Sequence, residues 1–167
     1  GILQAMGADI ILQNEREVGG EPVADIRVRY APLKGINIPQ DLVPLAIDEF
    51  PVLFIAAACA QGTTRLTGAE ELRVKESDRI ASMAEGLTTL GVANEVLADG
   101  IVIEGGTMGS GAVNTFNDHR IAMAFAVAAL RSEGEIHVLD CDHVATSFPD
   151  FEDLARSVGL QISAVAP

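Results

Sequence analysis

The sequence has few basic residues for its size. Only 11 lysines and arginines stand against 24 aspartates and glutamates in 167 residues, which gives a net charge of −13. A chain this acidic is a poor match for nucleic acid or for an anionic membrane surface, because both repel it. If the protein binds a small anion, it must gather its few cations in one place. Arg73, Lys75 and Arg79 do lie within seven residues of one another.

Cysteines, metal-ligand clusters and long apolar runs are also scarce. Cys59 and Cys141 are too few for a disulfide scaffold, and no residues show the close spacing of a zinc site. We therefore expect ordinary thiols of a reducing compartment and no metal. No apolar run is long enough to span a bilayer, and residues 1–6 lack the basic region of a secretion signal. These features favour a cytoplasmic protein without a membrane partner.

What is present is the pattern of an α/β fold. Apolar residues make up 49% of the chain and charged residues 21%, so a sizeable core can be buried. Short β-rich pieces alternate with helical stretches. The strands are expected near residues 10–12, 26–30, 64–66, 100–104 and 136–139, and the helices near 51–60, 78–90, 121–130 and 151–158.

Two of the expected helices are apolar on every side. The segments 51–60 and 121–130 have almost no polar face, so both must be wrapped by sheets or by other helices. The segment 78–90 differs, because its apolar residues recur on one face only. Gly91 follows it directly and indicates where this helix ends.

The chain also contains an internal repeat. Asp48 and Asp118 precede the two apolar helices and lie 70 residues apart, as do Ser77 and Ser147. We expect one domain over 1–167, with repeat units at about 34–105 and 106–164 and with 1–33 as the tail of a preceding unit. This start within the pattern, without an initial Met, suggests an excised piece of a longer protein. A plain two-layer α/β sandwich is the alternative architecture.

Polar residues gather where the expected helices begin. Asp, Asn and Ser are preferred helix N-caps, each contributing about 1 kcal/mol. We expect Ser77, Ser147 and Asp150 to be such caps, the last two as a capping box. For Asp48 and Asp118, capping and chemistry are equally good interpretations.

Cations at helix starts need another explanation. Lys75, Arg79 and Arg120 lie where the helix dipole favours anions. A phosphate or carboxylate bound at these helix starts would supply the missing partner. Glu76 is then either a surface carboxylate or a proton donor and acceptor. His119, beside Arg120, becomes a candidate ligand contact.

Four motifs resemble those of 5-enolpyruvylshikimate-3-phosphate synthases, in the same order. They are Ile47–Pro51, Leu72–Arg79, Asn117–Met123 and Ala145–Pro149. The resemblance covers nearly the whole chain from about residue 34. It implies an α/β fold in which each half of the enzyme is an inside-out α/β barrel of three βαβαββ units with buried central helices. This chain resembles most of the C-terminal half.

The resemblance also implies a reaction and site residues. These enzymes transfer the enolpyruvyl group of phosphoenolpyruvate to the 5-hydroxyl of shikimate 3-phosphate. Asp48 resembles the proposed base at that hydroxyl, Lys75 the lysine that bridges the substrates, and Glu76 the glutamate proposed to move a proton at the methylene carbon. Phosphoenolpyruvate would be held by Lys75, Arg79, His119 and Arg120.

One position departs from the family pattern. Many members carry a lysine just before the residue that matches Ser147, but this chain has Thr146 there. No cofactor is implied. The missing N-terminal half is the expected partner, so the chain alone is expected to have negligible activity. The alternatives are a UDP-N-acetylglucosamine enolpyruvyl transferase-like enzyme and a non-catalytic module that keeps the fold.

Overall fold

The protein has a mixed α/β structure, as the alternating pattern predicts. The structure is a computed structural model that describes residues 1–165. Its strands form three small sheets, with the orders β1-β2, β3-β5-β4 and β6-β7. Within the described residues, no helix combines the length and the hydropathy required to cross a bilayer.

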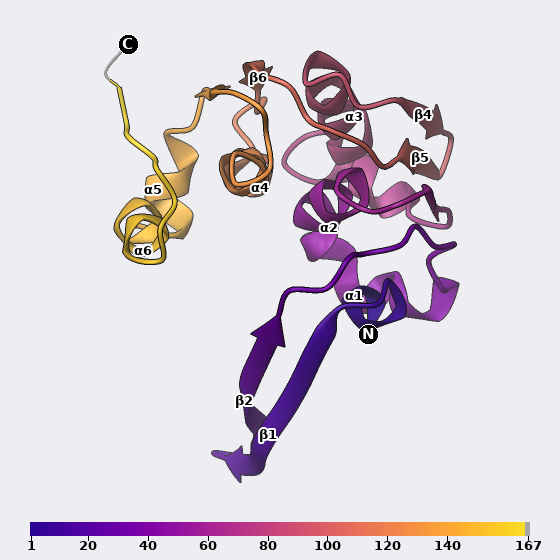
Figure 1. Cartoon of the computed structure of the whole chain (residues 1–167), viewed down its shortest axis with the longest axis vertical. Helices are drawn as coiled ribbons and strands as arrows, with labels where there is room; N and C mark the ends of the chain where they lie inside the picture. Colours follow the sequence, from indigo (N-terminus) through magenta and orange to yellow (C-terminus); the bar gives the residue numbers. More distant parts are fainter. Residues whose placement is uncertain (166–167) are drawn as a thin grey trace.

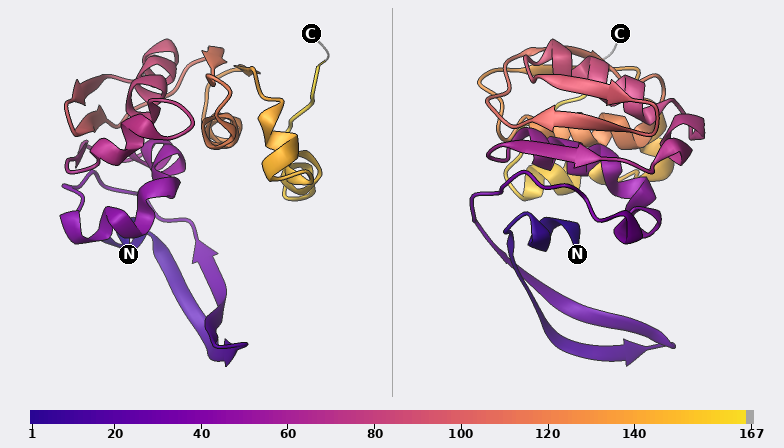
Figure 2. Two further views of the ribbon diagram at one scale, coloured as in Figure 1. Left: turned by 180° about the vertical axis from the view of Figure 1, so that it is seen from behind. Right: turned by 90° about the vertical axis from the view of Figure 1, so that its right-hand side faces the viewer.

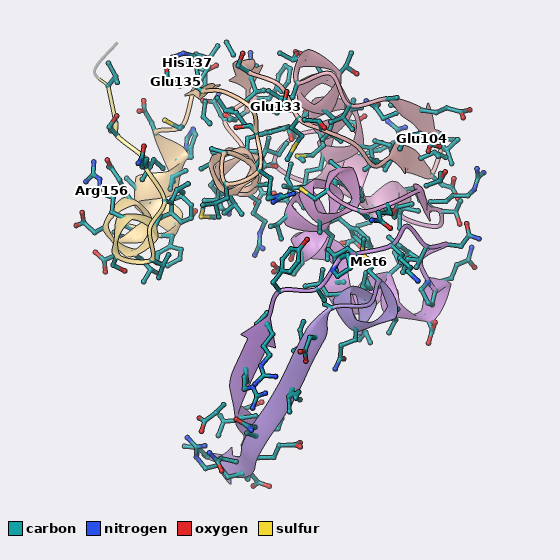
Figure 3. The ribbon with its side chains drawn as sticks, viewed as in Figure 1. Met6, Glu104, Glu133, Glu135, His137 and Arg156 are labelled. Atoms are coloured by element: carbon teal, nitrogen blue, oxygen red, sulfur yellow. The ribbon has the colours of Figure 1, made fainter. Side chains whose placement is uncertain are left out.

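The first sheet is a two-stranded ribbon that projects from the body of the molecule (Figure 1). Strand β1 (Asp9–Val18) pairs antiparallel with β2 (Glu21–Arg29), so both strands are longer than predicted. Leu12 pairs with Ile26, and the exposed Val28 continues the same apolar face. The buried Met6, just after the short helix α1 (Ile2–Ala5), lies where the ribbon joins the body (Figure 3). The ribbon itself therefore contributes little to the core.

The other two sheets lie beside the helices. Strands β3 (Thr63–Leu66) and β4 (Asn94–Leu97) both pair antiparallel with β5 (Gly100–Glu104), and this sheet lies across the helices (Figure 2). Strand β6 (Gly111–Asn114) pairs parallel with β7 (Ile136–Leu139). The sequence pattern predicted β3, β5 and β7 but missed β4 and β6.

The core is built around the two apolar helices, α2 (Phe50–Ala58) and α4 (His119–Ala128). They pack against each other and are seen nearly end-on in Figure 1. Phe54 of α2 and Phe125 of α4 are fully buried, as predicted for helices without a polar face. Val52, and Leu130 just after α4, are exceptions, because both are exposed.

Helix α3 (Arg79–Thr89) places its apolar face on this core and ends at Gly91, as predicted. Gly86 of α3 lies directly against Phe125, where a Cβ atom would come within 2.2 Å of the ring. The absence of a side chain at this position lets α3 and α4 approach closely.

The C-terminal helices correct one prediction. Ser147 is the last residue of α5 (His143–Ser147), so it does not cap the next helix, α6 (Phe151–Ser157). Asp150 is at the N-cap position of α6 but makes no side-chain capping bond. The capping box predicted for this pair is therefore wrong, because α5 already includes the serine. In Figure 3, Arg156 marks α6, on the far side of α4 from α3.

Within residues 1–165, three short 3₁₀ helices connect these elements. They are η1 (Gln40–Leu42), η2 (Pro44–Glu49) and η3 (Glu70–Val74). Helix η2 leads directly into α2, and η3 leads through four residues into α3. They thus set where the polar residues at the helix starts lie.

Candidate functional site

The polar residues predicted at the helix starts are joined by side-chain contacts. Asp48 comes from η2, the segment 75–78 precedes α3, and Asp118 is the N-cap of α4. Before Asp118, Phe116 and Asn117 have φ values of 52° and 59°, a left-handed turn that non-glycine residues rarely adopt. This turn directs the start of α4 toward the start of α3.

Arg79 is the residue that connects the three helix starts. Its side chain is only 1% exposed. Nε donates to Oδ2 of Asp118 at 2.8 Å, and Nη1 donates to Oδ1 of Asp48 at 3.1 Å. Nη2 donates to Oε2 of Glu76 at 2.6 Å. Three carboxylates from different segments are therefore held by one buried guanidinium group.

Asp118 has two structural tasks. Besides binding Arg79, its Oδ1 accepts the backbone N–H of Arg120 at 3.0 Å and that of Ile121 at 3.4 Å, which caps α4. Burial disfavours the ionised carboxylate, but Arg79 and these backbone donors outweigh it, so the pKa of Asp118 lies below its ordinary value. Asp118 is thus an ionised, fully buried carboxylate that links α3 and α4.

Ser77 belongs to the same cluster. Its hydroxyl lies 3.2 Å from Oδ2 of Asp118, and the N-cap of α3 is the next residue, Asp78. The expectation that Ser77 caps α3 is therefore wrong. The carboxylate of Asp78 accepts the backbone N–H of Ala81 at 3.0 Å and performs that role.

Lys75 and Asp48 form a second pair next to Arg79. Lys75 Nζ lies 3.4 Å from Oδ1 of Asp48 and 2.5 Å from Oε1 of Glu71. Burial opposes ionisation of Asp48, but Lys75, Arg120 and Arg79 together hold the pKa of this carboxyl below its usual range. Asp48 is therefore ionised at neutral pH and able to accept a hydrogen bond.

Arg120 closes the cluster from the α4 side. Its Nη1 donates to the backbone oxygen of Asp48 at 3.0 Å and to Oε1 of Glu49 at 2.8 Å. The side chain remains 33% exposed, so an anion in solution can reach it. His119, the first residue of α4, is partly exposed. Asp48, Lys75, Glu76, Arg79 and Arg120 are brought together by contacts, and His119 is the chain neighbour of one of them.

Arg73 lies outside this cluster, although it is close in sequence. Its Nε and Nη2 donate to the carbonyl oxygens of Ala98 and Leu97, and its Nη1 donates to Asp78. Arg73 therefore fixes η3 against the turn between β4 and β5 rather than facing the other cations.

Two depressions open beside the cluster. The larger, about 460 Å³, includes Glu76, Ser77, Glu85 and Phe116. The smaller, about 140 Å³, lies between α2 and α4 and includes Asp48, Val52 and Arg120. Among residues 1–165, no group of His, Cys, Asp or Glu side chains is arranged to hold a metal ion. The groups of this cluster that could contact a ligand are ammonium and guanidinium groups with carboxylates beside them.

Comparison with known proteins identifies the family. The model of EPSP synthase (3-phosphoshikimate 1-carboxyvinyltransferase) matches residues 1–154. The chain belongs to the EPSP synthase family. This result agrees with the resemblance of the four sequence motifs.

Individual EPSP synthase relatives match over almost the whole chain. Over 96% of this chain, the sequence is 64% identical to a 3-phosphoshikimate 1-carboxyvinyltransferase of Methylococcus capsulatus. Over 97% of this chain, it is 66% identical to one of Alkalilimnicola ehrlichii. A solved EPSP synthase structure from Acinetobacter baumannii aligns with a TM-score of 0.96 and 52% identity over 99% of the chain. The chain spans only 37% and 36% of the two curated relatives and 39% of the solved chain.

The interpretation of Asp118 as a helix N-cap is confirmed, but the sequence did not indicate its buried pairing with Arg79. Glu71 was missed, although it lies four residues before Lys75, a spacing at which opposite charges can meet.

Proposed function

We propose that this chain carries part of the active site of a 3-phosphoshikimate 1-carboxyvinyltransferase. The complete enzyme would transfer the enolpyruvyl group of phosphoenolpyruvate to the 5-hydroxyl of shikimate 3-phosphate and release phosphate. The observation that carries this proposal is the convergence of Asp48, Lys75, Glu76, Arg79 and Arg120 at the starts of three helices, in a chain of this family.

The charges of the cluster suit this reaction. The hydroxyl oxygen of shikimate 3-phosphate attacks C2 of phosphoenolpyruvate, and C3 gains a proton. Asp48, ionised beside Lys75, would accept the hydroxyl proton. Glu76, in its protonated form, would deliver its proton to C3, and the resulting carboxylate, held by Arg79, would remove a proton from C3 when phosphate leaves. Lys75 would lie between the substrates and stabilise the charge that develops.

The three cations would have different roles in binding. Lys75 and Arg120 are partly exposed, so they can contact the carboxylate or phosphate of phosphoenolpyruvate directly. Arg79 is buried among carboxylates, so its contact with substrate requires Asp48 or Glu76 to move. His119 would contact the ligand from the first turn of α4.

We also propose that α2 and α4 are central helices of an inside-out α/β barrel of repeated βαβαββ units. The burial of both helices, with α2 against β5, α3 and α4, and with α4 against β7 and α5, supports this architecture. The remaining part of a longer polypeptide would complete the barrel and supply the other side of the substrate cleft. Residues 1–167 alone would then have negligible activity.

The test is to complete the enzyme. The chain would be joined to the preceding part of the Methylococcus capsulatus relative, and release of phosphate would be measured with both substrates present. We expect turnover that needs phosphoenolpyruvate and shikimate 3-phosphate, and none from the 167-residue chain alone. No turnover by a folded joined protein would favour a non-catalytic module, and thermal protection by UDP-N-acetylglucosamine instead of shikimate 3-phosphate would favour the other transferase.

Two variants assign the roles within the joined enzyme. Glu76→Ala and Lys75→Ala should each lower kcat about 100-fold or more and leave the unfolding temperature nearly unchanged. The matched control is Glu95→Ala, which removes an exposed glutamate of β4. If the two site variants lose stability but keep normal turnover, these residues are structural and the assignment is wrong.

A further inference from the structure

The shortest contact of Lys75 is with a residue to which the family resemblance gives no role. Its ammonium lies 2.5 Å from Glu71 but 3.4 Å from Asp48. Glu71 is 59% exposed, so it is not needed to fill the core. A polar contact this close at an accessible position suggests a function connected with the lysine.

The carboxylate of Glu71 is presented from a fixed turn. Helix η3, which carries it, is anchored by the fully buried Leu72. The next residue, Arg73, donates to the carbonyl oxygens of Leu97 and Ala98. Lys75 follows in an extended conformation, with φ −82° and ψ −155°, and its side chain returns to Glu71. The position of Glu71 is therefore set by the fold before any ligand binds.

The carboxylate of Glu71 competes with an incoming anion for the Lys75 ammonium. The described cluster has the three cations Lys75, Arg79 and Arg120 in contact with five carboxylates: Asp48, Glu49, Glu71, Glu76 and Asp118. An anion approaching Lys75 is attracted by the ammonium and repelled by Glu71. Because Glu71 is exposed, it can turn away into solvent at low cost, whereas Asp48 is also tied to Arg79.

We propose that Glu71 is a positioning residue that holds the Lys75 ammonium beside Asp48 in the ligand-free protein and releases it to the anionic substrate. The proposal rests on the proposed function in one respect, since it takes Lys75 to be a substrate contact. The ion pair itself does not depend on that function. Glu71 does not touch the reacting atoms, so its effect passes entirely through the lysine.

The titration of Lys75 follows from the same contacts. The hydrogen bond with Glu71 raises the pKa of the lysine, and Asp48 of η2 adds to this effect. Arg79 of α3 and Arg120 of α4 act on Lys75 through Asp48, with which both share contacts. Removing the charge of Glu71 should therefore lower the pKa of Lys75 and leave the ammonium more available to an added anion.

The first experiment uses the chain as it is and requires no catalysis. The sequence has two lysines, Lys34 and Lys75, so a sample labelled with ¹³C-lysine gives two side-chain signals that can be followed with pH. Glu71→Gln should lower the titration midpoint of the Lys75 signal. Glu70→Gln is the matched control, because it removes a neighbouring exposed carboxylate of the same 3₁₀ helix. Equal Lys75 titrations in the two variants would overturn the proposal.

The second experiment uses the joined enzyme and tests the release step. Glu71→Gln should lower KM for phosphoenolpyruvate about two- to fivefold, the range expected for a largely exposed pair. The alkaline limb of kcat/KM should move to lower pH, because that profile reports groups of the free enzyme. Glu70→Gln should change neither quantity. A KM for Glu71→Gln that is unchanged or increased would refute the competition.

The two experiments separate the possible failures. A joined enzyme without turnover would count against the proposed function, while the lysine titration still decides whether Glu71 holds Lys75. If turnover is normal but the titration does not respond to Glu71→Gln, the function stands and this inference is wrong.

Discussion

Replacing Asp118 by asparagine tests the buried contact between α3 and α4. The carboxylate of Asp118 is fully buried and lies 2.8 Å from Nε of Arg79, which is also buried. Asparagine keeps the shape of the side chain and an oxygen for the backbone N–H groups of Arg120 and Ile121. It removes the charge and replaces one acceptor oxygen by an amide N–H₂ donor, which faces the guanidinium unfavourably.

The expected cost follows from the partners that remain. Removing one member of a buried ion pair costs about 3–5 kcal/mol, because the other charge is left uncompensated. Arg79 still contacts Asp48 and Glu76, so we expect Asp118→Asn to lower the free energy of unfolding by about 2–4 kcal/mol. Asp118→Ala should cost about 1 kcal/mol more, since it also removes the cap of α4.

Urea unfolding followed by far-ultraviolet circular dichroism is the appropriate assay. The sequence has no tryptophan, and its one tyrosine, Tyr30, is 86% exposed, so intrinsic fluorescence would report little. Asp78→Asn is the matched control, because Asp78 also caps a helix and binds an arginine but is partly exposed. It should cost less than about 1 kcal/mol. Equal losses in the two variants would refute the reasoning.

Acid provides a second readout of the same substitution. The folded-state pKa of Asp118 is lowered, so its stabilisation is complete above the ordinary value of about 4. This stabilisation is lost as the pH falls through the lower folded-state pKa. The free energy of unfolding of the unmodified protein should therefore decline more steeply in acid than that of Asp118→Asn. Parallel acid limbs would mean that Asp118 is not an ionised partner of Arg79.

Two further predictions concern packing and dynamics. Gly86→Ala should lower the free energy of unfolding by about 1–3 kcal/mol in the same urea assay, because the new methyl group meets the ring of Phe125. Glu85→Ala, at the exposed neighbouring position, is the control and should not lower it. A Gly86→Ala variant that is more stable than the unmodified protein would contradict the packing. In hydrogen exchange with the 167-residue chain, peptides covering β1 and β2 should exchange much faster than those covering α4, because an isolated two-stranded ribbon is marginally stable. Equal protection of the two regions would show that the ribbon is packed against another part of the protein.

Much of the fold was predictable because its strongest signals are local. The all-apolar segments gave α2 and α4, and the one-sided pattern before Gly91 gave α3 to within about one residue at each end. The four-residue strands β4 and β6 were missed, since so short a segment carries little periodicity and β6 depends on pairing with a strand more than twenty residues away. The capping box at Ser147 failed because α5 had already formed there.

The sequence indicated that polar residues gather at the helix starts, but it did not indicate their pairing or the contribution of Glu71. Cations at helix starts identified Lys75, Arg79 and Arg120 because they oppose the helix dipole. Which carboxylate each cation binds depends on the approach of α3 to α4, which no local pattern reports. The sequence therefore did not indicate that Arg79 would be enclosed by carboxylates while Arg120 stays accessible.

The enclosure of Arg79 restricts how this protein can diverge. One guanidinium group joins segments that are 31 and 39 residues away from it, so replacing it would disturb the packing of several helices together. Substitution at a partly exposed position such as His119 carries less risk to the architecture. Arg79 and Asp118 can change only as a pair, and a double substitution in one step is rare. Accepted substitutions should therefore accumulate at the rim of the cluster and spare its centre.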